Sequence, residues 1–247
     1  MTKILEVKHV SKKYNTIDGE IKALDDISFD DIEGEFVAIL GMSGCGKSTL
    51  LSILAGLVRK TSGDIKYMHD NIVTGYMLQD DALLEHMSIE NNILLGLKIQ
   101  KKLNDNTYKE TMNLLNKYGL DKFKDKRPSQ LSGGMKQRVA LIRTLAIKPD
   151  ILFLDEAFSA LDYSTRLKVS DDVYKIIKDT GKTTIKITHD IGEAISMADK
   201  VIVLSKGPAK VKNIYKIELY NKDIPTNNRN DSKFDYYYNL ISKDLNV

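Results

Sequence analysis

The chain has 247 residues, of which 42% are hydrophobic and 29% are charged, a composition that excludes a disordered or a fibrous protein. The longest apolar runs, such as residues 53–58, are far shorter than the ~20 residues that a helix needs to span a bilayer. The 37 basic and 34 acidic residues are interspersed along the chain, and a net charge of +3 gives little reason to expect nucleic-acid binding.

Four short apolar runs predict the strands of one β-sheet. They cover residues 36–40, 151–154, 183–188 and 201–204, and the first three are each followed by a helical pattern. Continuous apolar strands that alternate with helices are typical of a mostly parallel sheet with helices on both faces. The fold class is therefore α/β. Because no Ser, Gly or Pro tract divides the chain, we expect a single domain over residues 1–247.

Two further segments are expected before the second of these strands. Residues 4–14 alternate in part between apolar and polar side chains, which predicts an antiparallel edge strand. Residues from about 80 to 130 are polar, rich in lysine and helical in their periodicity, including residues 107–118. They predict a helical subdomain inserted on the sheet.

A C-terminal extension is expected over residues from about 207 to 247. Its first part, 211–219, alternates like a strand, and a loop is expected over 221–231. A last helix follows, whose apolar side chains are spaced to share one face that packs on the domain. These side chains are Phe234, Tyr238, Ile241 and Leu245.

A glycine-rich loop follows the strand at 36–40. It matches the pattern G-x-x-x-x-G-K-[ST] and precedes an apolar helix predicted over 50–57. Backbone N–H groups of such a loop bind phosphate oxygens, and the helix N-terminus adds a partial positive charge. We expect Lys47 to neutralise the β- and γ-phosphates and the Ser48 hydroxyl to bind Mg²⁺. The expected nucleotide-binding residues are Gly41, Met42, Ser43, Gly44, Cys45, Gly46, Lys47, Ser48 and Thr49.

Two adjacent carboxylates end the strand at 151–154. A buried strand does not normally finish with two acids unless a cation or a polar reaction lies at its carboxyl end. A strand that runs out into solvent is the alternative, which the upstream glycine-rich loop disfavours. We expect Asp155 to hold Mg²⁺, mostly through water, and Glu156 to orient and deprotonate the attacking water.

A second glycine cluster reads Leu-Ser-Gly-Gly-Met-Lys-Gln-Arg over residues 131–138 and precedes an apolar helical pattern at 139–145. Ser132 is a good N-cap, and Gly133 and Gly134 expose backbone N–H groups, so the segment predicts another helix start that binds an anion. By itself Ser-Gly-Gly would be an ordinary turn. The glycine-rich loop upstream favours the interpretation as a helix start that binds an anion.

In this order the three motifs resemble those of the ATP-binding subunit of ABC transporters, and the likeness extends over nearly the whole chain. The resemblance implies a P-loop NTPase (RecA-like) core, with an antiparallel β-subdomain and the inserted helical subdomain, that binds ATP and Mg²⁺. It also implies that Gln79 contacts Mg²⁺ and the attacking water, that residues 159–162 form the D-loop, and that His189 lies at the γ-phosphate. Tyr14 would stack on adenine, an edge-strand aromatic being the alternative.

The resemblance further implies a site shared by two copies, arranged head to tail, in which each Ser132 segment closes on the ATP of its partner. The sequence of residues 189–194 and 201–205 is similar to that of the ATP-binding subunits of importers of nitrate, sulfonates, taurine and thiamin-precursor pyrimidines. We therefore expect ATP hydrolysis to drive solute uptake through separate permease subunits, with an extracytoplasmic solute-binding protein as an indirect partner. The alternatives are an ATPase of an exporter or lipid-handling system, and a non-transport ABC ATPase.

Such a subunit is expected at the cytoplasmic face of the cell membrane. Glu6 and Lys8 stand where a signal peptide would need its apolar stretch, so no export signal is expected. The segment after the predicted Mg²⁺-binding glutamine is where a permease would dock. Asp80, Asp81 and Leu84 are candidates for that contact, with a solvated loop as the alternative.

Two residues invite separate expectations. Cys45 lies beside Lys47 at a helix N-terminus, which predicts a lowered thiol pKa and a reactive thiolate, although a small residue that fits the loop is equally compatible. Lys186 lies within the apolar strand at 183–188, where full burial would be costly. We expect either that Lys186 reaches the margin of the sheet or that this strand is exposed.

Overall fold

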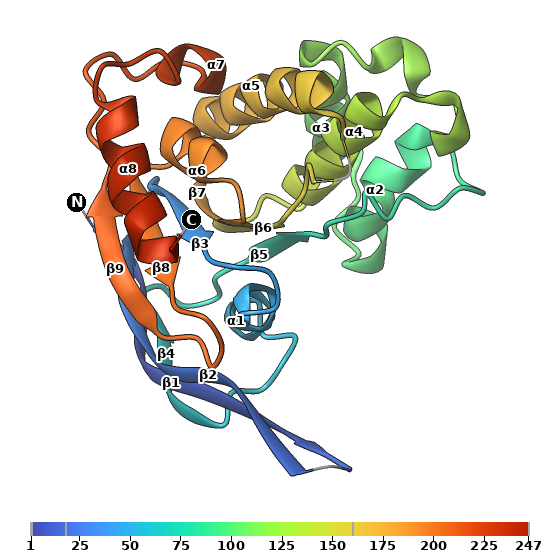
Figure 1. Ribbon diagram of the computed structural model, residues 1–247. Helices are drawn as coiled ribbons and strands as arrows, with labels where there is room; N and C mark the ends of the chain where they lie inside the picture. Colours follow the sequence, from blue (N-terminus) through green and yellow to red (C-terminus); the bar gives the residue numbers. More distant parts are fainter. Residues whose placement is uncertain (1, 18, 160, 247) are drawn as a thin grey trace.

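The computed structural model describes residues 2–17, 19–159 and 161–246 (Figure 1). Six strands form the main sheet in the order β5-β6-β7-β3-β8-β9. Neighbouring strands from β5 to β8 are parallel, and β9 pairs antiparallel with β8. The α/β class and the four predicted strands are confirmed. The bounds are Thr74–Met77 (β5), Ile151–Asp155 (β6), Thr183–Thr188 (β7), Phe36–Leu40 (β3), Lys200–Leu204 (β8) and Val211–Lys216 (β9).

The strands of this sheet separate two hydrophobic cores. Ala38 and Leu40 of β3 face the first core, while Val37 and Ile39 face the second, because successive strand side chains point to opposite faces. The first core is covered by most of the helices, and the second by α1 and an antiparallel sheet (Figure 1). The bounds are Lys47–Leu54 (α1), Ile89–Ile99 (α2), Asp105–Lys117 (α3), Gly133–Ala146 (α4), Tyr163–Thr180 (α5), Ile191–Met197 (α6), Pro225–Asn228 (α7) and Phe234–Leu245 (α8).

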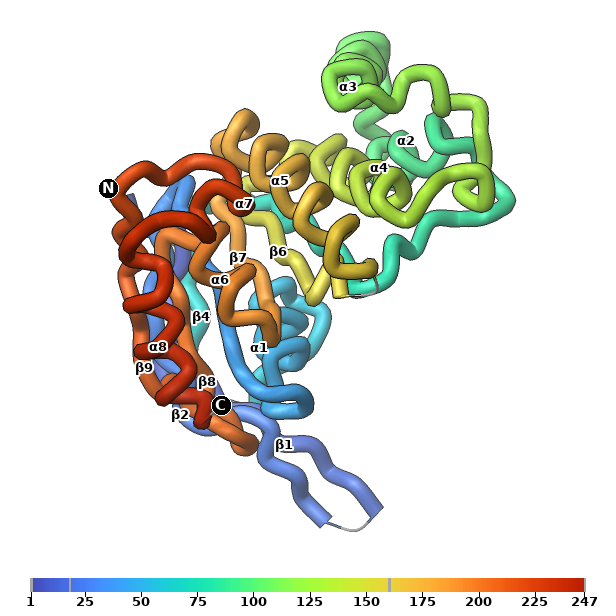
Figure 2. The backbone as a smooth tube through the Cα atoms, turned by 45° about the horizontal axis from the view of Figure 1, so that its top comes forward, coloured from blue at the N-terminus to red at the C-terminus, as the bar shows by residue number. Residues whose placement is uncertain are grey.

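The antiparallel sheet has the order β2-β1-β4, with β1 at Lys3–Thr16, β2 at Gly19–Ile32 and β4 at Ser62–Tyr67. The prediction that residues 4–14 form an edge strand is wrong, because β1 is paired on both sides. Alternation reports which face of a strand is buried, and it is the same whether one or both edges are hydrogen-bonded. Beyond the reach of β4, β1 and β2 continue as a hairpin that projects from the body of the molecule (Figure 2).

The helical subdomain is present as predicted, with its helices starting at polar caps. The side chain of Ser88 accepts a hydrogen bond from the Asn91 N–H at the start of α2, and Asn104 forms a capping box with Thr107 at the start of α3. Residues 78–88 are irregular rather than helical, and two 3₁₀ turns, Asp121–Phe123 and Pro128–Gln130, lead to α4.

Three predicted boundaries differ from the structure. The helix predicted over 50–57 is α1, which begins at Lys47 and ends at Leu54, since Gly56 adopts a φ of 75° that ends the helical path. The strand predicted over 211–219 ends at Lys216, and the loop at 221–231 contains the short helix α7.

The last helix is confirmed as α8, with Phe234, Ile241 and Leu245 buried. Tyr238, however, is 43% exposed. Its ring stacks on that of Phe234 at a centroid distance of 6.4 Å, so Tyr238 lies at the rim of the contact rather than within it.

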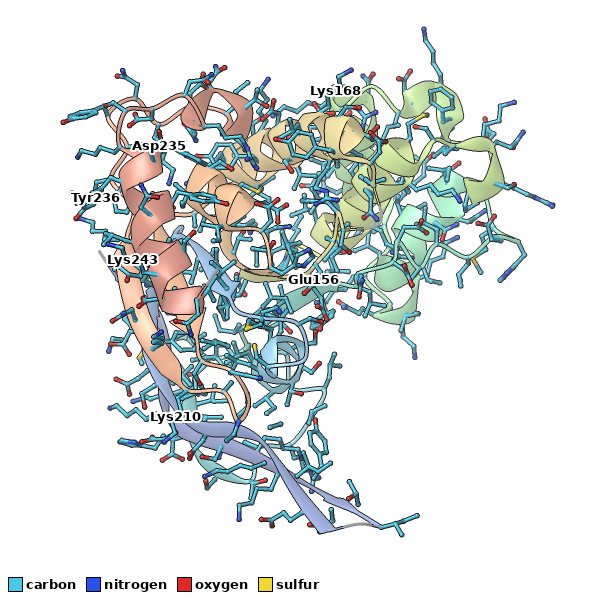
Figure 3. The ribbon with its side chains drawn as sticks, in the orientation of Figure 1. Glu156, Lys168, Lys210, Asp235, Tyr236 and Lys243 are labelled. Carbon is cyan, nitrogen blue, oxygen red and sulfur yellow. The ribbon has the colours of Figure 1, made fainter. Side chains whose placement is uncertain are left out.

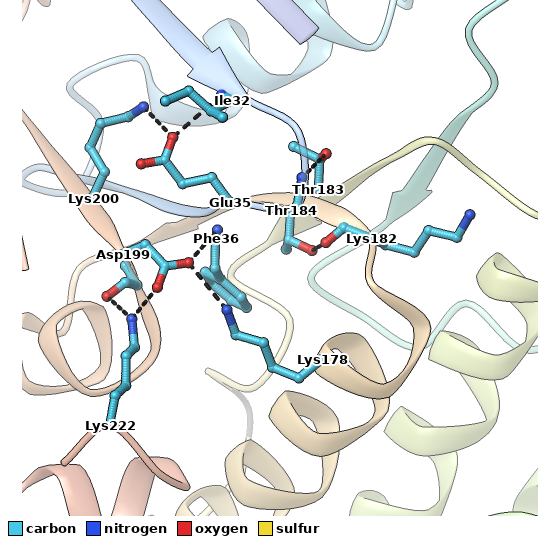
Figure 4. A network of polar contacts seen from close by, with 12 residues as sticks. Ile32, Glu35, Phe36, Lys178, Lys182, Thr183, Thr184, Asp199, Lys200 and Lys222 are labelled. Atoms are coloured by element: carbon cyan, nitrogen blue, oxygen red, sulfur yellow. Dashed lines mark hydrogen bonds and ion pairs between the residues drawn. The ribbon is translucent and has the colours of Figure 1, made fainter. Parts of the chain in front are cut away.

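A polar network joins the elements at the amino ends of the strands, opposite the glycine-rich loop (Figure 4). Asp199 accepts hydrogen bonds from the Phe36 N–H at 2.8 Å and from Lys178 Nζ at 3.2 Å, and it pairs with Lys222. Lys200 Nζ donates to Glu35 Oε2 at 2.6 Å. The network fixes the starts of β3 and β8. It thereby helps to set the direction of β3, which the glycine-rich loop follows in the chain.

Candidate active site

The glycine-rich loop between β3 and α1 borders a cavity of about 300 Å³. Gly46 has a φ of 118°, and a Cβ atom there would lie 2.9 Å from the backbone oxygen of Ala23, so the position requires glycine. Gly44, with a φ of 74°, has a backbone that favours glycine as well. The cavity is lined by Ser43, Gly44, Gly46, Lys47, Ser48, Thr49, Gln79 and Glu156, all of which were predicted site residues.

Lys47 is buried at the mouth of this loop. Its Nζ donates hydrogen bonds to the carbonyl oxygens of Gly41 and Met42 at 2.9 and 3.1 Å, and lies 3.5 Å from Glu156 Oε1. The ammonium group is therefore held between the loop and the end of β6, where an anionic ligand would replace the carboxylate as its partner.

Asp155 is held by two hydroxyl groups. Ser48 Oγ donates to Asp155 Oδ1 at 3.0 Å, and the Tyr76 hydroxyl donates to Oδ2 at 2.8 Å. Burial raises the pKa of Tyr76 above its ordinary value, with Asp155 contributing in the same direction, so Tyr76 remains a neutral donor. Tyr76 carries no motif of its own, and its place on β5 beside β6 becomes visible only in the folded sheet.

Glu156 lies where β6 ends, near the centre of the molecule (Figure 3). Its φ of 42° places a non-glycine residue in the left-handed region, which costs energy and therefore needs support from neighbouring groups. Glu156 Oε2 is 3.1 Å from His189 Nδ1, at the end of β7. The two predicted catalytic residues are thus in contact.

Gln79 connects the cavity to the predicted D-loop, because its Nε2 donates to Ser159 Oγ at 3.2 Å. Ala160 lies outside the described residues. Asp162 caps α5, and hydrogen bonds from Thr165 and Ser164 lower the pKa of its carboxyl group to about 2. The cap is therefore charged at neutral pH and fixes the start of α5.

The second glycine cluster does not border the cavity, whose lining residues lie elsewhere in the chain. Ser132 caps α4 by accepting a hydrogen bond from the Met135 N–H, as predicted. A Cβ atom at Gly133 would lie 2.9 Å from Leu161, and one at Gly134 would lie 2.8 Å from Val169. These glycines thus also permit close packing of α4 on the segment before α5 and on α5 itself.

Tyr14 is also absent from the cavity lining. It lies on the projecting hairpin, paired with Ile21. The residue is 38% exposed, and Lys12 Nζ lies 4.6 Å from the centroid of its ring. An exposed ring is available for stacking, so the adenine contact stays a prediction.

The loop after Gln79 is held from behind by Arg143. The guanidinium group donates to the carbonyl oxygens of Asp81 and Ala82, at 2.7 Å each. Asp80 is exposed, whereas Asp81 and Leu84 are half-buried. The loop therefore has a fixed backbone with some side chains open to a partner, and its role in docking stays a prediction. No sequence motif pointed to Arg143.

The expected reactivity of Cys45 is contradicted. The side chain is buried, and this burial raises the pKa of the thiol above its ordinary value, outweighing the opposite effect of Lys47. A Cβ atom at Gly41 would lie 2.8 Å from Cys45 Sγ, so the thiol packs beneath the loop. Cys45 is a small core residue.

Both expectations for Lys186 are also wrong. Lys186 is 1% exposed and lies within β7, between β6 and β3. Its Nζ is 3.3 Å from Glu193 Oε1. The sequence could not show that the glutamate seven residues later faces back onto the strand and neutralises the charge.

Comparison with known proteins agrees with this geometry. Residues 24–159 match the family model described as ABC transporter. An uncharacterized ABC transporter ATP-binding protein of Bacillus subtilis (strain 168) is 43% identical over 251 residues, which cover 98% of this chain and 95% of that protein. The taurine import ATP-binding protein of Jannaschia sp. (strain CCS1) is 37% identical over 235 residues, which cover 93% of this chain and 88% of that protein.

A solved structure shows the same fold. It is a dimeric ATP-binding cassette in a post-hydrolysis state, bound to ADP and Pi, with a TM-score of 0.71 and 29% identity. The superposition covers 87% of this chain and 99% of the cassette. Within residues 2–17, 19–159 and 161–246, no helix combines the length and the apolar character needed to cross a membrane.

Proposed function

The chain belongs to the ABC transporter family of ATP-binding proteins, and we propose that it hydrolyses Mg-ATP in the cavity beneath its glycine-rich loop. It is the ATPase subunit of an import system, and the exporter and non-transport alternatives are set aside. The observation that carries the site assignment is the meeting of Lys47, Glu156 and His189, which come from α1 and from the ends of two neighbouring strands.

The nucleotide phosphates would bind at the N-terminus of α1. The backbone N–H groups of residues 44–48 and the helix dipole favour an anion there, and Lys47 adds a full positive charge. When phosphate oxygens take over Lys47, Glu156 loses its ammonium partner and becomes available to a water molecule.

The residues present fit a magnesium ion. Ser48 Oγ and Asp155 Oδ1 lie 3.0 Å apart, and Gln79 lines the same cavity, so oxygen donors converge there. Among the described residues no three His, Cys, Asp or Glu side chains form a metal site, which suits an ion that takes its other ligands from phosphates and water. When bound, the ion would neutralise charge on the phosphates.

Glu156 is proposed as the general base. Its carboxylate would accept a proton from water as the water oxygen bonds to the γ-phosphorus, while the bond between that phosphorus and the bridging oxygen of ADP breaks. His189, at 3.1 Å from Glu156, would hold the carboxylate and the γ-phosphate in register. The products are ADP and inorganic phosphate.

A second copy is proposed as the partner that completes the site. Ser132 and Gly133 are exposed at the N-terminus of α4 and do not border the cavity of their own chain. A head-to-tail dimer would bring this helix end to the γ-phosphate bound by the partner.

We also propose permease subunits that dock at the loop after Gln79, attachment at the cytoplasmic face of the membrane, and an extracytoplasmic solute-binding protein. The solute is proposed to be small, such as taurine, another sulfonate, nitrate or a pyrimidine.

The decisive experiment compares the purified chain with its Glu156→Gln variant. We expect turnover to fall by at least about 10²-fold, because the general base is lost. Binding of ATP should persist, and the variant should elute as a dimer with ATP and as a monomer with ADP. Normal hydrolysis by the variant would reject the role of Glu156. A chain that fails to hydrolyse ATP would reject the proposed site as a whole.

A further inference from the structure

Lys186 places an ammonium group inside an apolar sheet. Its neighbours across the sheet are Ala38 on β3 and Leu154 on β6. A lone charge at such a position would be strongly destabilising. The carboxylate of Glu193, on α6, lies 3.3 Å from Nζ, and among the described residues neither of the two facing atoms has a hydrogen-bond partner. The two side chains thus form a buried ion pair.

This ion pair is continuous with the loop that carries His189. The other carboxylate oxygen of Glu193 accepts a hydrogen bond from Thr188 Oγ1 at 2.6 Å. Thr188 Oγ1 in turn accepts from the Asp190 N–H at 3.1 Å, and Asp190 Oδ1 accepts from the Glu193 N–H at 2.9 Å. His189 therefore stands between two residues that are both tied to Glu193.

The same ammonium group contacts the turn that carries Glu156. Lys186 Nζ lies 4.0 Å from the centroid of the Phe158 ring, a cation–π contact that is stronger where water is excluded. Phe158 is buried and follows Glu156 by two residues. Because the backbone of Glu156 is left-handed, the turn keeps its shape only where its surroundings hold it.

We infer that Lys186 and Glu193 are positioning residues that set the contact between Glu156 and His189 from beneath, without touching the nucleotide. The inference rests on the proposed hydrolysis of ATP at this site. The alternative is a pair that only neutralises itself, since many buried ion pairs can be replaced by apolar groups without loss of stability. Removing one partner destabilises the protein in either case, so single variants alone do not separate the two roles.

The double variant Lys186→Met with Glu193→Gln separates them in the whole chain. It removes both charges together, keeps an unbranched stem against Phe158 and leaves an amide oxygen for Thr188. We expect a melting temperature close to that of the wild type, an unchanged Kd for a fluorescent ATP analogue, and a kcat reduced about tenfold at unchanged KM. Wild-type kcat in this variant would overturn the inference.

A double-mutant cycle with His189→Ala tests the route and stays valid if a variant is partly unfolded, because kcat is expressed per nucleotide-binding site. If Lys186 acts through His189, Lys186→Met slows turnover in the wild-type background and has little further effect once the imidazole is gone. Equal slowing in both backgrounds would overturn the inference.

The matched control is Ile185→Ala. Ile185 precedes Lys186 on β7 but faces the other hydrophobic core, so the substitution should lower the melting temperature without changing kcat per binding site. Failure of the proposed function looks different, since it would appear as a wild type without ATPase activity or as a Glu156→Gln variant with normal activity.

Discussion

Oε2 of Glu156 lies 3.1 Å from Nδ1 of His189, although the two residues are 33 positions apart and end different strands. Parallel strands β6 and β7 are neighbours, so their carboxyl ends deliver both side chains to one point. A single pair of atoms makes this contact, so substitutions of Glu156 and of His189 can test the two side chains separately.

His189→Ala is expected to lower kcat by about 10²-fold while the Kd for ATP changes little, because the imidazole contacts the Glu156 carboxylate and does not line the cavity at the glycine-rich loop. Steady-state ATPase assays and nucleotide titration measure the two quantities. His9→Ala is the control, since His9 lies on β1 and pairs with Asp26. A large rise in Kd with unchanged kcat would contradict the assignment.

Tyr76→Phe is expected to weaken the response to Mg²⁺ about tenfold, since the variant removes the donor that orients Asp155. The measurement is the Mg²⁺ concentration that gives half-maximal ATPase activity. Tyr67→Phe is a matched control, because the Tyr67 hydroxyl donates to the carbonyl of Leu54, the last residue of α1. Equal effects of the two substitutions would show that the hydrogen bond to Asp155 is unimportant.

Cys45 should resist alkylation in the folded protein. Its thiol is buried and its pKa is raised, so we expect iodoacetamide to react at least about tenfold more slowly at pH 7.5 than in the urea-unfolded chain. Mass spectrometry of timed samples measures both rates. Rapid labelling of the native chain, with protection by Mg-ATP, would instead revive a reactive thiolate.

Asp31 should make stability depend on pH. Its side chain is buried, and burial raises the pKa of its carboxyl group to about 8, against a smaller opposite effect of Lys200. Between the ordinary pKa near 3.8 and about 8, the folded state holds a proton that the unfolded state releases. The free energy of unfolding therefore falls as pH rises through that window, by up to ~1.4 kcal/mol per pH unit.

Asp31→Asn removes this titration, so its unfolding free energy should depend less steeply on pH than that of the wild type. Urea unfolding at pH 5, 6.5 and 8 measures the difference. Parallel pH profiles of the two proteins would mean that Asp31 is ionised in the folded state.

Asp81→Lys is expected to abolish transport in the assembled importer while the ATPase activity of the isolated subunit stays within about twofold, because Asp81 does not line the cavity at the glycine-rich loop. Uptake of labelled solute into vesicles and ATPase assays give the comparison. Asp64→Lys is the control, since the Asp64 side chain is 91% exposed on β4. Unchanged transport in the Asp81 variant would reject the docking assignment.

The glycine-rich loop and the strands around it could be predicted because their signals are local. Residues 41–49 combine three glycines, a lysine and three hydroxyl side chains in one short segment, and the apolar run of β3 precedes them directly. Asp155 and Glu156 could be placed near this loop because the carboxyl ends of parallel strands meet at one edge of the sheet.

The features that could not be predicted depend on contacts between segments that are far apart along the chain. The hydrophobic periodicity of a segment does not show which other segment it contacts. The central place of β1 follows from its pairing with β4, about 60 residues away. The burial of Lys186 depends on how α6 packs, and the support of Asp155 by Tyr76 depends on which strand lies beside β6. The polarity of a residue indicates the free energy that its burial would cost. It does not show which side chain will pair with it in the folded protein.

The left-handed backbone of Glu156 makes the residue preference of the backbone differ from that of the proposed chemistry. A glycine would adopt a φ of 42° with less strain, so Glu156→Gly should relieve roughly 1 kcal/mol of backbone strain. The same substitution removes the proposed base and the carboxylate that pairs with the buried Lys47. As far as backbone strain is concerned, glycine is therefore favoured over glutamate at this position. The proposed role of Glu156 as general base thus places the chemistry at a position where the backbone prefers glycine.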